Sequence, residues 1–134
     1  MYEPILRIMT ACGYKVECEY ECPNIQQPKR GDKKRLDFYA TGKSREIALE
    51  VKWLTSTKPV LTRDIEKLRA VFESDRKAFP LLCLFGRQTF VANVDISGYG
   101  FVERGRAVYA DFRRTKYACR VYELTKPAGR RTPR

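Results

Sequence analysis

Apolar and polar residues alternate in three early segments of the chain. Between residues 14 and 21 (YKVECEYE), tyrosine, valine and cysteine side chains fall on one side, and lysine and glutamate side chains on the other. This two-residue period predicts a half-exposed β-strand. Two further strands are predicted at 34–41 and 46–54, and the short turn at 42–44 between them favours a hairpin.

A period near 3.6 residues predicts two helices. In residues 2–12 apolar side chains recur on one face, and Gly13 follows as a stop signal. Residues 60–74 repeat the pattern, with a stripe of leucine, isoleucine and phenylalanine and with charged side chains on the other faces. Both helices are therefore expected to bury one side against a sheet.

The later part of the chain is also predicted to be rich in strands. The run at 81–85 (LLCLF) is apolar throughout, which indicates a mid-sheet strand covered on both faces. We expect this run and Trp53 to lie in the core. Alternating runs at 106–113 and 117–124 predict a late hairpin, and the Pro-, Gly- and Arg-rich residues 126–134 predict a disordered basic tail.

The predicted order is helix, strand, strand, strand, helix, strand, followed by the late hairpin. This order indicates an α/β protein with a mixed central sheet flanked by helices and a C-terminal β extension. A chain of 134 residues has room for one domain. We place that domain at residues 1–125.

Basic residues outnumber acidic ones by 27 to 16, which gives a net charge of +11. Such a surplus favours a polyanionic partner, nucleic acid first and an anionic membrane surface second, although a basic surface without a dedicated partner is the alternative. No apolar stretch approaches the ~20 residues that span a bilayer. The N-terminal residues also lack the layout of a signal peptide. We therefore expect a cytoplasmic location and no membrane partner.

The chain has no histidine and five cysteines. Without histidine it cannot build a Ser-His-Asp triad, a Cys-His pair or a histidine-ligated zinc hydrolase. The cysteines are odd in number and scattered, which favours reduced thiols, and no further ligands accompany Cys18 and Cys22 to make a zinc site. Hydrolytic chemistry would have to rest on carboxylates, lysine and a hard metal ion.

Three charged residues interrupt the apolar strands predicted at 34–41 and 46–54. Glu50 and Lys52 share one face of the second strand because side chains alternate. Burying either charge unpaired would cost several kcal/mol. Asp37 stands between two apolar residues of the first strand. If the strands pair as a hairpin, Asp37 and Glu50 converge at the sheet surface.

Two converging carboxylates suit Mg²⁺, a hard cation that prefers oxygen ligands, and Mn²⁺ can substitute for it. The metal would lower the pKa of a bound water and neutralise charge on a phosphoryl group. Lys52, roughly 6.6 Å along the strand from Glu50, would orient that water or stabilise the transition state. The alternative is a cross-strand salt-bridge cluster on an exposed sheet face.

The Asp/Glu-x-Lys tripeptide alone is weak evidence, since two further copies begin at Asp32 and Asp75. Only the copy at Glu50 lies within an apolar strand and follows a strand-borne aspartate at a hairpin-like distance. Asp37, then Glu50 with Lys52, within this order of elements, resembles the PD-(D/E)XK nuclease superfamily. That superfamily includes many restriction endonucleases and the small archaeal Holliday junction resolvases.

The resemblance extends over roughly residues 3–86 and implies a restriction-endonuclease-like core. It implies that Asp37 and Glu50 bind the catalytic metal and that Lys52 assists the attacking water. It further implies a metal ligand from the first helix, for which Glu3 is the matching position. Leu36 stands where the signature has proline, and that position contributes backbone shape rather than a ligand.

We therefore expect a metal-dependent endonuclease acting on DNA. One alternative is a catalytically inactive nucleic-acid-binding or accessory protein on the same fold, and another is a protein–protein module. A chain this small has limited surface for gripping two strands, which leaves a homodimer as an option. Basic residues in three segments are candidate phosphate contacts, with a solvated surface as the alternative: Lys33, Lys34, Arg35, Lys58, Arg63, Lys67, Arg113, Arg114 and Lys116.

Overall fold

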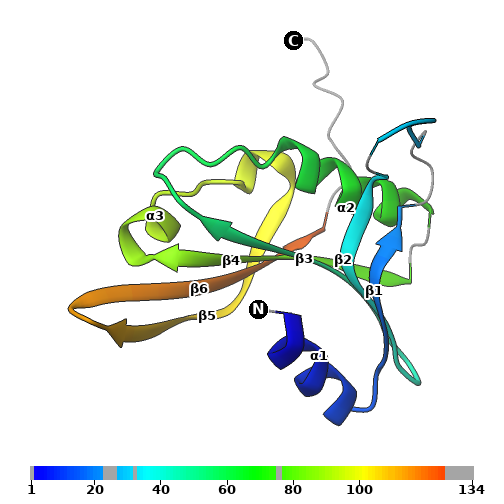
Figure 1. Ribbon diagram of the computed structural model, residues 1–134, viewed down its shortest axis with the longest axis horizontal. Helices are drawn as coiled ribbons and strands as arrows, with labels where there is room; N and C mark the ends of the chain where they lie inside the picture. The colour runs from blue at the N-terminus through cyan, green and yellow to red at the C-terminus, as the bar shows by residue number, and fades with distance from the viewer. Residues whose placement is uncertain (1, 23–26, 32, 75–76, 126–134) are drawn as a thin grey trace.

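The computed structural model describes residues 2–22, 27–31, 33–74 and 77–125. These residues form a six-stranded mixed sheet flanked by helices, in the strand order β1-β2-β3-β4-β6-β5 (Figure 1). The predicted α/β class is confirmed. The elements along the chain are α1 (Tyr2–Ala11), β1 (Lys15–Glu21), β2 (Arg35–Thr41), β3 (Glu46–Leu54), α2 (Thr62–Ser74), β4 (Ala78–Arg87), α3 (Gln88–Ala92), the 3-10 helix η1 (Ser97–Tyr99), β5 (Phe101–Phe112) and β6 (Thr115–Leu124).

The strand pairing places β3 in the interior of the sheet. β3 pairs with β2 as the antiparallel hairpin that the sequence predicts, and with β4 in parallel. Parallel neighbours need a crossover connection, and α2 supplies it. The β1–β2, β4–β6 and β5–β6 pairs are antiparallel.

Each face of the sheet packs against a different helix. On one side, α2 buries Ile65, Leu68 and Val71 against the sheet. On the other side, Ile5 and Leu6 of α1 pack against a smaller buried cluster. Figure 1 shows α1 beneath the β1–β3 part of the sheet and α2 on the opposite face. The sheet residues of the α2 side include Leu36, Ala48, Leu54, Leu82 and Leu84, and those of the α1 side are Phe38, Val51 and Cys83.

Several predicted elements are longer than their sequence pattern indicates. The strand predicted at 81–85 runs from Ala78 to Arg87, and both strands of the late hairpin are extended. Helices α3 and η1 were not predicted, because each is a short turn without a periodic stripe. The placement of Trp53 in the core is wrong. Its side chain is 49% exposed, because α1, the short helix that packs on that face, covers only one half of the sheet.

Two further sequence expectations concern the C-terminal tail and the cysteines. The tail predicted at 126–134 lies outside the described residues. All five cysteines are described and none forms a disulfide, as the sequence predicts. Within the ranges that the structure describes, no helix has the length and apolar character needed to cross a bilayer.

Candidate active site

At the two predicted carboxylates, backbone-to-backbone pairing of β2 and β3 is replaced by hydrogen bonds from backbone N–H groups to the carboxylate side chains. The paired register runs as far as Phe38 opposite Leu49. The backbone N–H of Asp37 then donates to Glu50 Oε1 at 3.1 Å, and that of Val51 donates to Asp37 Oδ2 at 2.7 Å. Each carboxylate therefore bridges to the opposite strand, so the two acidic groups lie side by side.

A change in the direction of β2 exposes Asp37 to the pocket. Residues two apart in a strand normally share a face, yet Leu36 packs on the α2 side and Phe38 on the α1 side. The strand therefore twists at Asp37. Opposite Asp37 on β1, Glu19 has a left-handed backbone (φ 51°), which is uncommon for a residue other than glycine. The irregularity thus lies at the same level on two neighbouring strands, β1 and β2.

Tyr2 of α1 reaches the same carboxylate from the other face. Its hydroxyl donates to Asp37 Oδ1 at 2.5 Å. This hydrogen bond, together with burial and the negative charges of Asp37, Glu50 and Glu19, raises the pKa of the Tyr2 phenol well above its ordinary value. Tyr2 therefore stays protonated and acts as a fixed donor to Asp37.

Glu50 is the one charged side chain in the core of the described structure, with 2% of its surface exposed. Burial raises the pKa of Glu50 to about 8, and the nearby charge of Asp37 acts in the same direction. The ammonium group of Lys67 opposes this shift. Its Nζ lies 3.1 Å from Glu50 Oε2 and donates to the Arg35 carbonyl at 3.0 Å.

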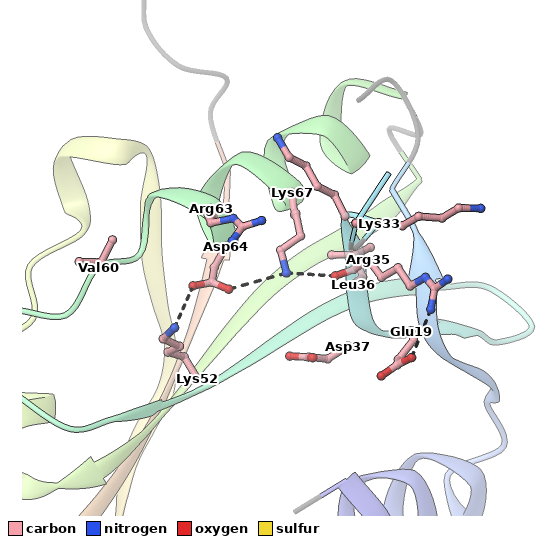
Figure 2. A pocket seen from close by; sticks show the side chains of 12 residues that line it. Glu19, Lys33, Arg35, Leu36, Asp37, Lys52, Val60, Arg63, Asp64 and Lys67 are labelled. Atoms are coloured by element: carbon pink, nitrogen blue, oxygen red, sulfur yellow. Dashed lines mark hydrogen bonds and ion pairs between the residues drawn. The ribbon is translucent and has the colours of Figure 1, made fainter. Parts of the chain in front are cut away.

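A second carboxylate of α2 joins the lysines into one network. Asp64 Oδ1 lies 3.8 Å from Lys67 Nζ, and Asp64 Oδ2 lies 3.8 Å from Lys52 Nζ. Lys52 thus extends from β3 toward the start of α2, on the same face as Glu50. Figure 2 shows Lys67 between Asp64 and the Arg35 end of β2, with Lys52 below Asp64.

These groups border a pocket of about 730 Å³ at the point where β2, β3 and α2 meet (Figure 2). Six basic side chains and three acidic ones line it, so its surface favours an anionic ligand. The buried Glu50 does not line the pocket itself, but it contacts two residues that do, Lys67 and Asp37. The lining consists of Glu19, Gly31, Lys33, Lys34, Arg35, Leu36, Asp37, Lys52, Val60, Arg63, Asp64 and Lys67.

The structure gathers most of the predicted site residues but leaves others apart. Asp37 and Lys52 lie at the pocket, together with the candidate phosphate contacts Lys33, Lys34, Arg35, Arg63 and Lys67. Glu3 instead pairs with Arg7 along the exposed side of α1, at 2.6 Å. Away from the pocket lie Lys58, in the segment before α2, and Arg113, Arg114 and Lys116, at the end of the β5–β6 hairpin.

Sequence reasoning missed the part that α2 plays in the site. The sequence indicates Lys67 only as a phosphate contact, and it does not indicate Asp64 as a site residue. Both flank the buried stripe formed by Ile65 and Leu68. Charged residues that flank the apolar stripe of a helix lie at the border of its contact with the sheet. This position is the signal by which the sequence could have indicated a buried partner for Asp64 and Lys67. No comparable signal identifies Tyr2 or Glu19.

Asp37 and Glu50 have the chemistry of a two-carboxylate metal site. Among the described residues, no group of three or more acidic, cysteine or histidine side chains is arranged to hold a metal ion. Mg²⁺ commonly binds proteins through one or two carboxylates and keeps several waters. The remaining coordination would therefore come from water and substrate.

No protein-family model, curated protein or solved structure matches this chain significantly.

Proposed function

We propose that this chain is a metal-dependent endonuclease that hydrolyses phosphodiester bonds in DNA, with a site of the PD-(D/E)XK kind. The observation that carries the proposal is the pair of backbone hydrogen bonds that holds Asp37 and Glu50 together beside a basic pocket. The order of α1, three antiparallel strands, α2 and the parallel strand β4 supports a restriction-endonuclease-like core.

The two carboxylates retain capacity for Mg²⁺, or Mn²⁺ in its place. Their four oxygens accept hydrogen bonds from Tyr2, Lys67 and two backbone N–H groups. A carboxylate oxygen has a second lone pair, so each remains able to coordinate a cation. When bound, the metal lowers the pKa of a water ligand and neutralises charge on the phosphoryl oxygens.

The chain's own cations position and stabilise the substrate. Lys52 presents a positive charge to the pocket from the strand that carries Glu50, where it stabilises the charge that develops on the phosphate during hydrolysis. The other basic side chains of the pocket bind neighbouring phosphates. Because a protonated Glu50 is a poor metal ligand, activity at limiting metal rises with pH toward the pKa of Glu50, which is about 8.

A second function has a specific observation in its favour. Lys67 already pairs with Glu50, and Lys52 lies within ion-pair distance of Asp64. A network in which each charge has an internal partner also suits a protein that binds DNA without cutting it. Such a binding or accessory protein would use the same basic surface and would need no metal.

Nicking of supercoiled plasmid separates these two functions. The endonuclease predicts nicking with Mg²⁺ and loss of nicking with chelator. Glu50→Gln, Asp37→Asn and Lys52→Ala should each reduce the rate on the order of 100-fold or more, as expected for loss of charge stabilisation at a reacting phosphate. Lys43→Ala, in the β2–β3 turn away from the pocket, is the matched control and should retain activity.

A second readout, thermal unfolding with and without Mg²⁺, does not depend on turnover. Metal binding to the native protein should raise the Tm of the unaltered chain but not that of Glu50→Gln. Nicking that survives in all three site variants, or in chelator, would mean that the activity comes from elsewhere. DNA binding without nicking or a Mg²⁺ response would favour the accessory function.

A further inference from the structure

One half of the α1-side face of the sheet carries exposed aromatic and apolar side chains. Trp53 of β3 lies on this face because Val51, two residues earlier, packs in the α1-side cluster. The strand register continues the row from Trp53 to Phe85, Cys119 and Val108. Figure 1 shows the β5–β6 hairpin projecting beyond the part of the sheet that α1 covers. Helix α1 therefore leaves this half of the face open.

Three aromatic rings mark this open half, and we call them the aromatic strip: Trp53, Phe112 and Tyr117. Tyr117 and Phe112 share the face of Cys119 and Val108 by alternation along the hairpin. The rings of Trp53 and Tyr117 have centroids 5.9 Å apart and are tilted by 34°, so they are not stacked in parallel. Trp53 is 49% exposed and Phe112 61% exposed, which leaves ring surface available to a ligand.

Three cations lie at the end of the hairpin that carries the strip. Arg113 and Arg114 form its turn, both with left-handed backbones (φ 49° and 65°). Lys116 follows on β6, opposite Asp111 in the register and on the face away from Tyr117. Among the described residues, no carboxylate lies within ion-pair distance of these three side chains. The Arg113 guanidinium instead lies 5.2 Å from the Phe112 ring centroid. We call these three residues the hairpin cations.

Exposed aromatic rings beside cations that form no ion pair are suited to bind single-stranded nucleotides. Bases stack on exposed rings while phosphates pair with the cations, and each stacked base contributes about 1–3 kcal/mol. In a duplex the base faces are already stacked on one another and are not available. A second copy of the chain is disfavoured as the occupant, because contact between the two open faces would bring two sets of hairpin cations together.

We propose that the aromatic strip and the hairpin cations bind a single-stranded segment of DNA. In the nuclease proposed above, on which this part of the inference rests, that segment flanks the bond to be cut. Lys52 and Trp53 are consecutive residues of β3, and they present the pocket and the strip on opposite faces of the same strand end. The substrate class is therefore DNA with unpaired nucleotides next to the cleavage site.

Trp53 provides a direct test because it is the only tryptophan in the chain. In chelator, a thymidine oligonucleotide of roughly ten nucleotides, within the range of single-strand site sizes, should quench its fluorescence to saturation. A blunt duplex with the same number of phosphates should quench it far less at equal salt. The proposal is overturned if the single strand binds without quenching, or if the duplex quenches equally. Emission that changes with protein concentration alone would also overturn it, because a second copy would then occupy the strip.

Variants that preserve apolar packing test the aromatic contribution. Tyr117→Leu and Phe112→Leu should each weaken binding of the fluorescein-labelled single strand about 10-fold, measured by anisotropy. Phe79→Leu is the matched control, since Phe79 is also an exposed aromatic beside an arginine, Arg45, but lies at the opposite end of β4. Equal loss in the control, or no loss in either strip variant, would contradict base stacking.

Glu50→Gln separates this inference from the nuclease proposal. It should abolish nicking and leave Trp53 quenching unchanged. If unaltered protein quenches with single strands but never nicks DNA, single-strand binding stands and the nuclease proposal fails. If it nicks DNA with Mg²⁺ but shows no quenching on binding, the nuclease proposal stands and the strip has no such role.

Discussion

The pocket and the end of the β5–β6 hairpin are both basic, but their cations have different partners. Most of the pocket cations lie within 4 Å of a carboxylate, whereas no carboxylate in the described structure lies that close to the hairpin cations. The paired set in the pocket is Lys33, Lys34, Arg35, Lys52 and Lys67. Net charge alone hides this difference. The pocket cations mostly form ion pairs within the protein, whereas the hairpin cations form none with the described residues and can bind an external anion.

Removal of Lys67 should have the largest effect on stability, because it leaves a buried carboxylate without a cation. We expect Lys67→Met to lower the free energy of unfolding by about 3 kcal/mol in conditions where Glu50 is ionised, well above its pKa of about 8. The loss should shrink at acidic pH, where Glu50 is protonated. Urea unfolding at both pH values measures it.

Arg114→Met is the matched control for that experiment, because it removes an equal charge from the hairpin. Its effect should stay within about 0.5 kcal/mol at either pH, as for other surface substitutions. Similar losses in the two variants would erase the distinction between paired and unpaired cations.

The next largest effect concerns the pH dependence of stability. The pKa of Glu50 is about 8 in the folded chain against 4.5 as the ordinary value, so the folded state binds more protons between these values. The contribution of Glu50 to stability is complete below about pH 4.5 and is lost as pH rises through about 8. Because the chain has no histidine, few other groups titrate in this window.

Glu50→Gln should remove that dependence. Between mildly acidic and mildly alkaline pH, the Tm of the unaltered protein should fall by about 5 °C or more, and that of Glu50→Gln should change far less. Glu66→Gln, an exposed glutamate of the same charge on α2, serves as the control and should follow the unaltered protein. Parallel curves for all three proteins would show that Glu50 ionises normally.

A smaller effect is expected in the salt dependence of single-strand binding. Each phosphate contact contributes about 0.7 to the slope of log affinity against log salt. The double variant Arg113→Gln with Arg114→Gln should therefore lower the slope by about 1.4. Lys15→Gln with Lys43→Gln removes the same charge far from the hairpin. An equal change in that control would mean that the whole surface, rather than the hairpin, attracts DNA.

The smallest effect should come from Glu3, whose partner Arg7 is itself exposed. Glu3→Ala should change the free energy of unfolding by less than about 1 kcal/mol, as for other surface ion pairs. The rise of Tm with Mg²⁺ should also be unchanged. Loss of that rise would restore Glu3 as a ligand, as the family resemblance implies.

The sequence predicts the order of elements well because periodicity is a local property. The hairpin of β2 and β3 follows from alternation and a short turn, and it brings Asp37 and Glu50 together as expected. The exposure of Trp53 is not predictable in this way. It depends on how far α1 extends across the sheet, which no local pattern determines.

The ion pairs of the site are likewise set by tertiary packing. Lys67 meets Glu50 only because α2 crosses over β3 at one angle and position, which the sequence of either element does not specify. No glycine or proline beside Asp37 indicates in the sequence that β2 twists there. The sequence therefore identifies Glu50 and Lys52 as site residues, but it does not show that they pair with Lys67 and Asp64.

The crossover helix has a consequence for the order of folding. The charged residues of the site are close together in the sequence, so their contacts close short loops at low entropic cost. They are Asp37, Glu50, Lys52, Asp64 and Lys67. The hairpin joins the sheet through β6, much later in the sequence. We expect the charged site to form early, so that in stopped-flow experiments Lys67→Met slows refolding while Tyr117→Leu mainly accelerates unfolding.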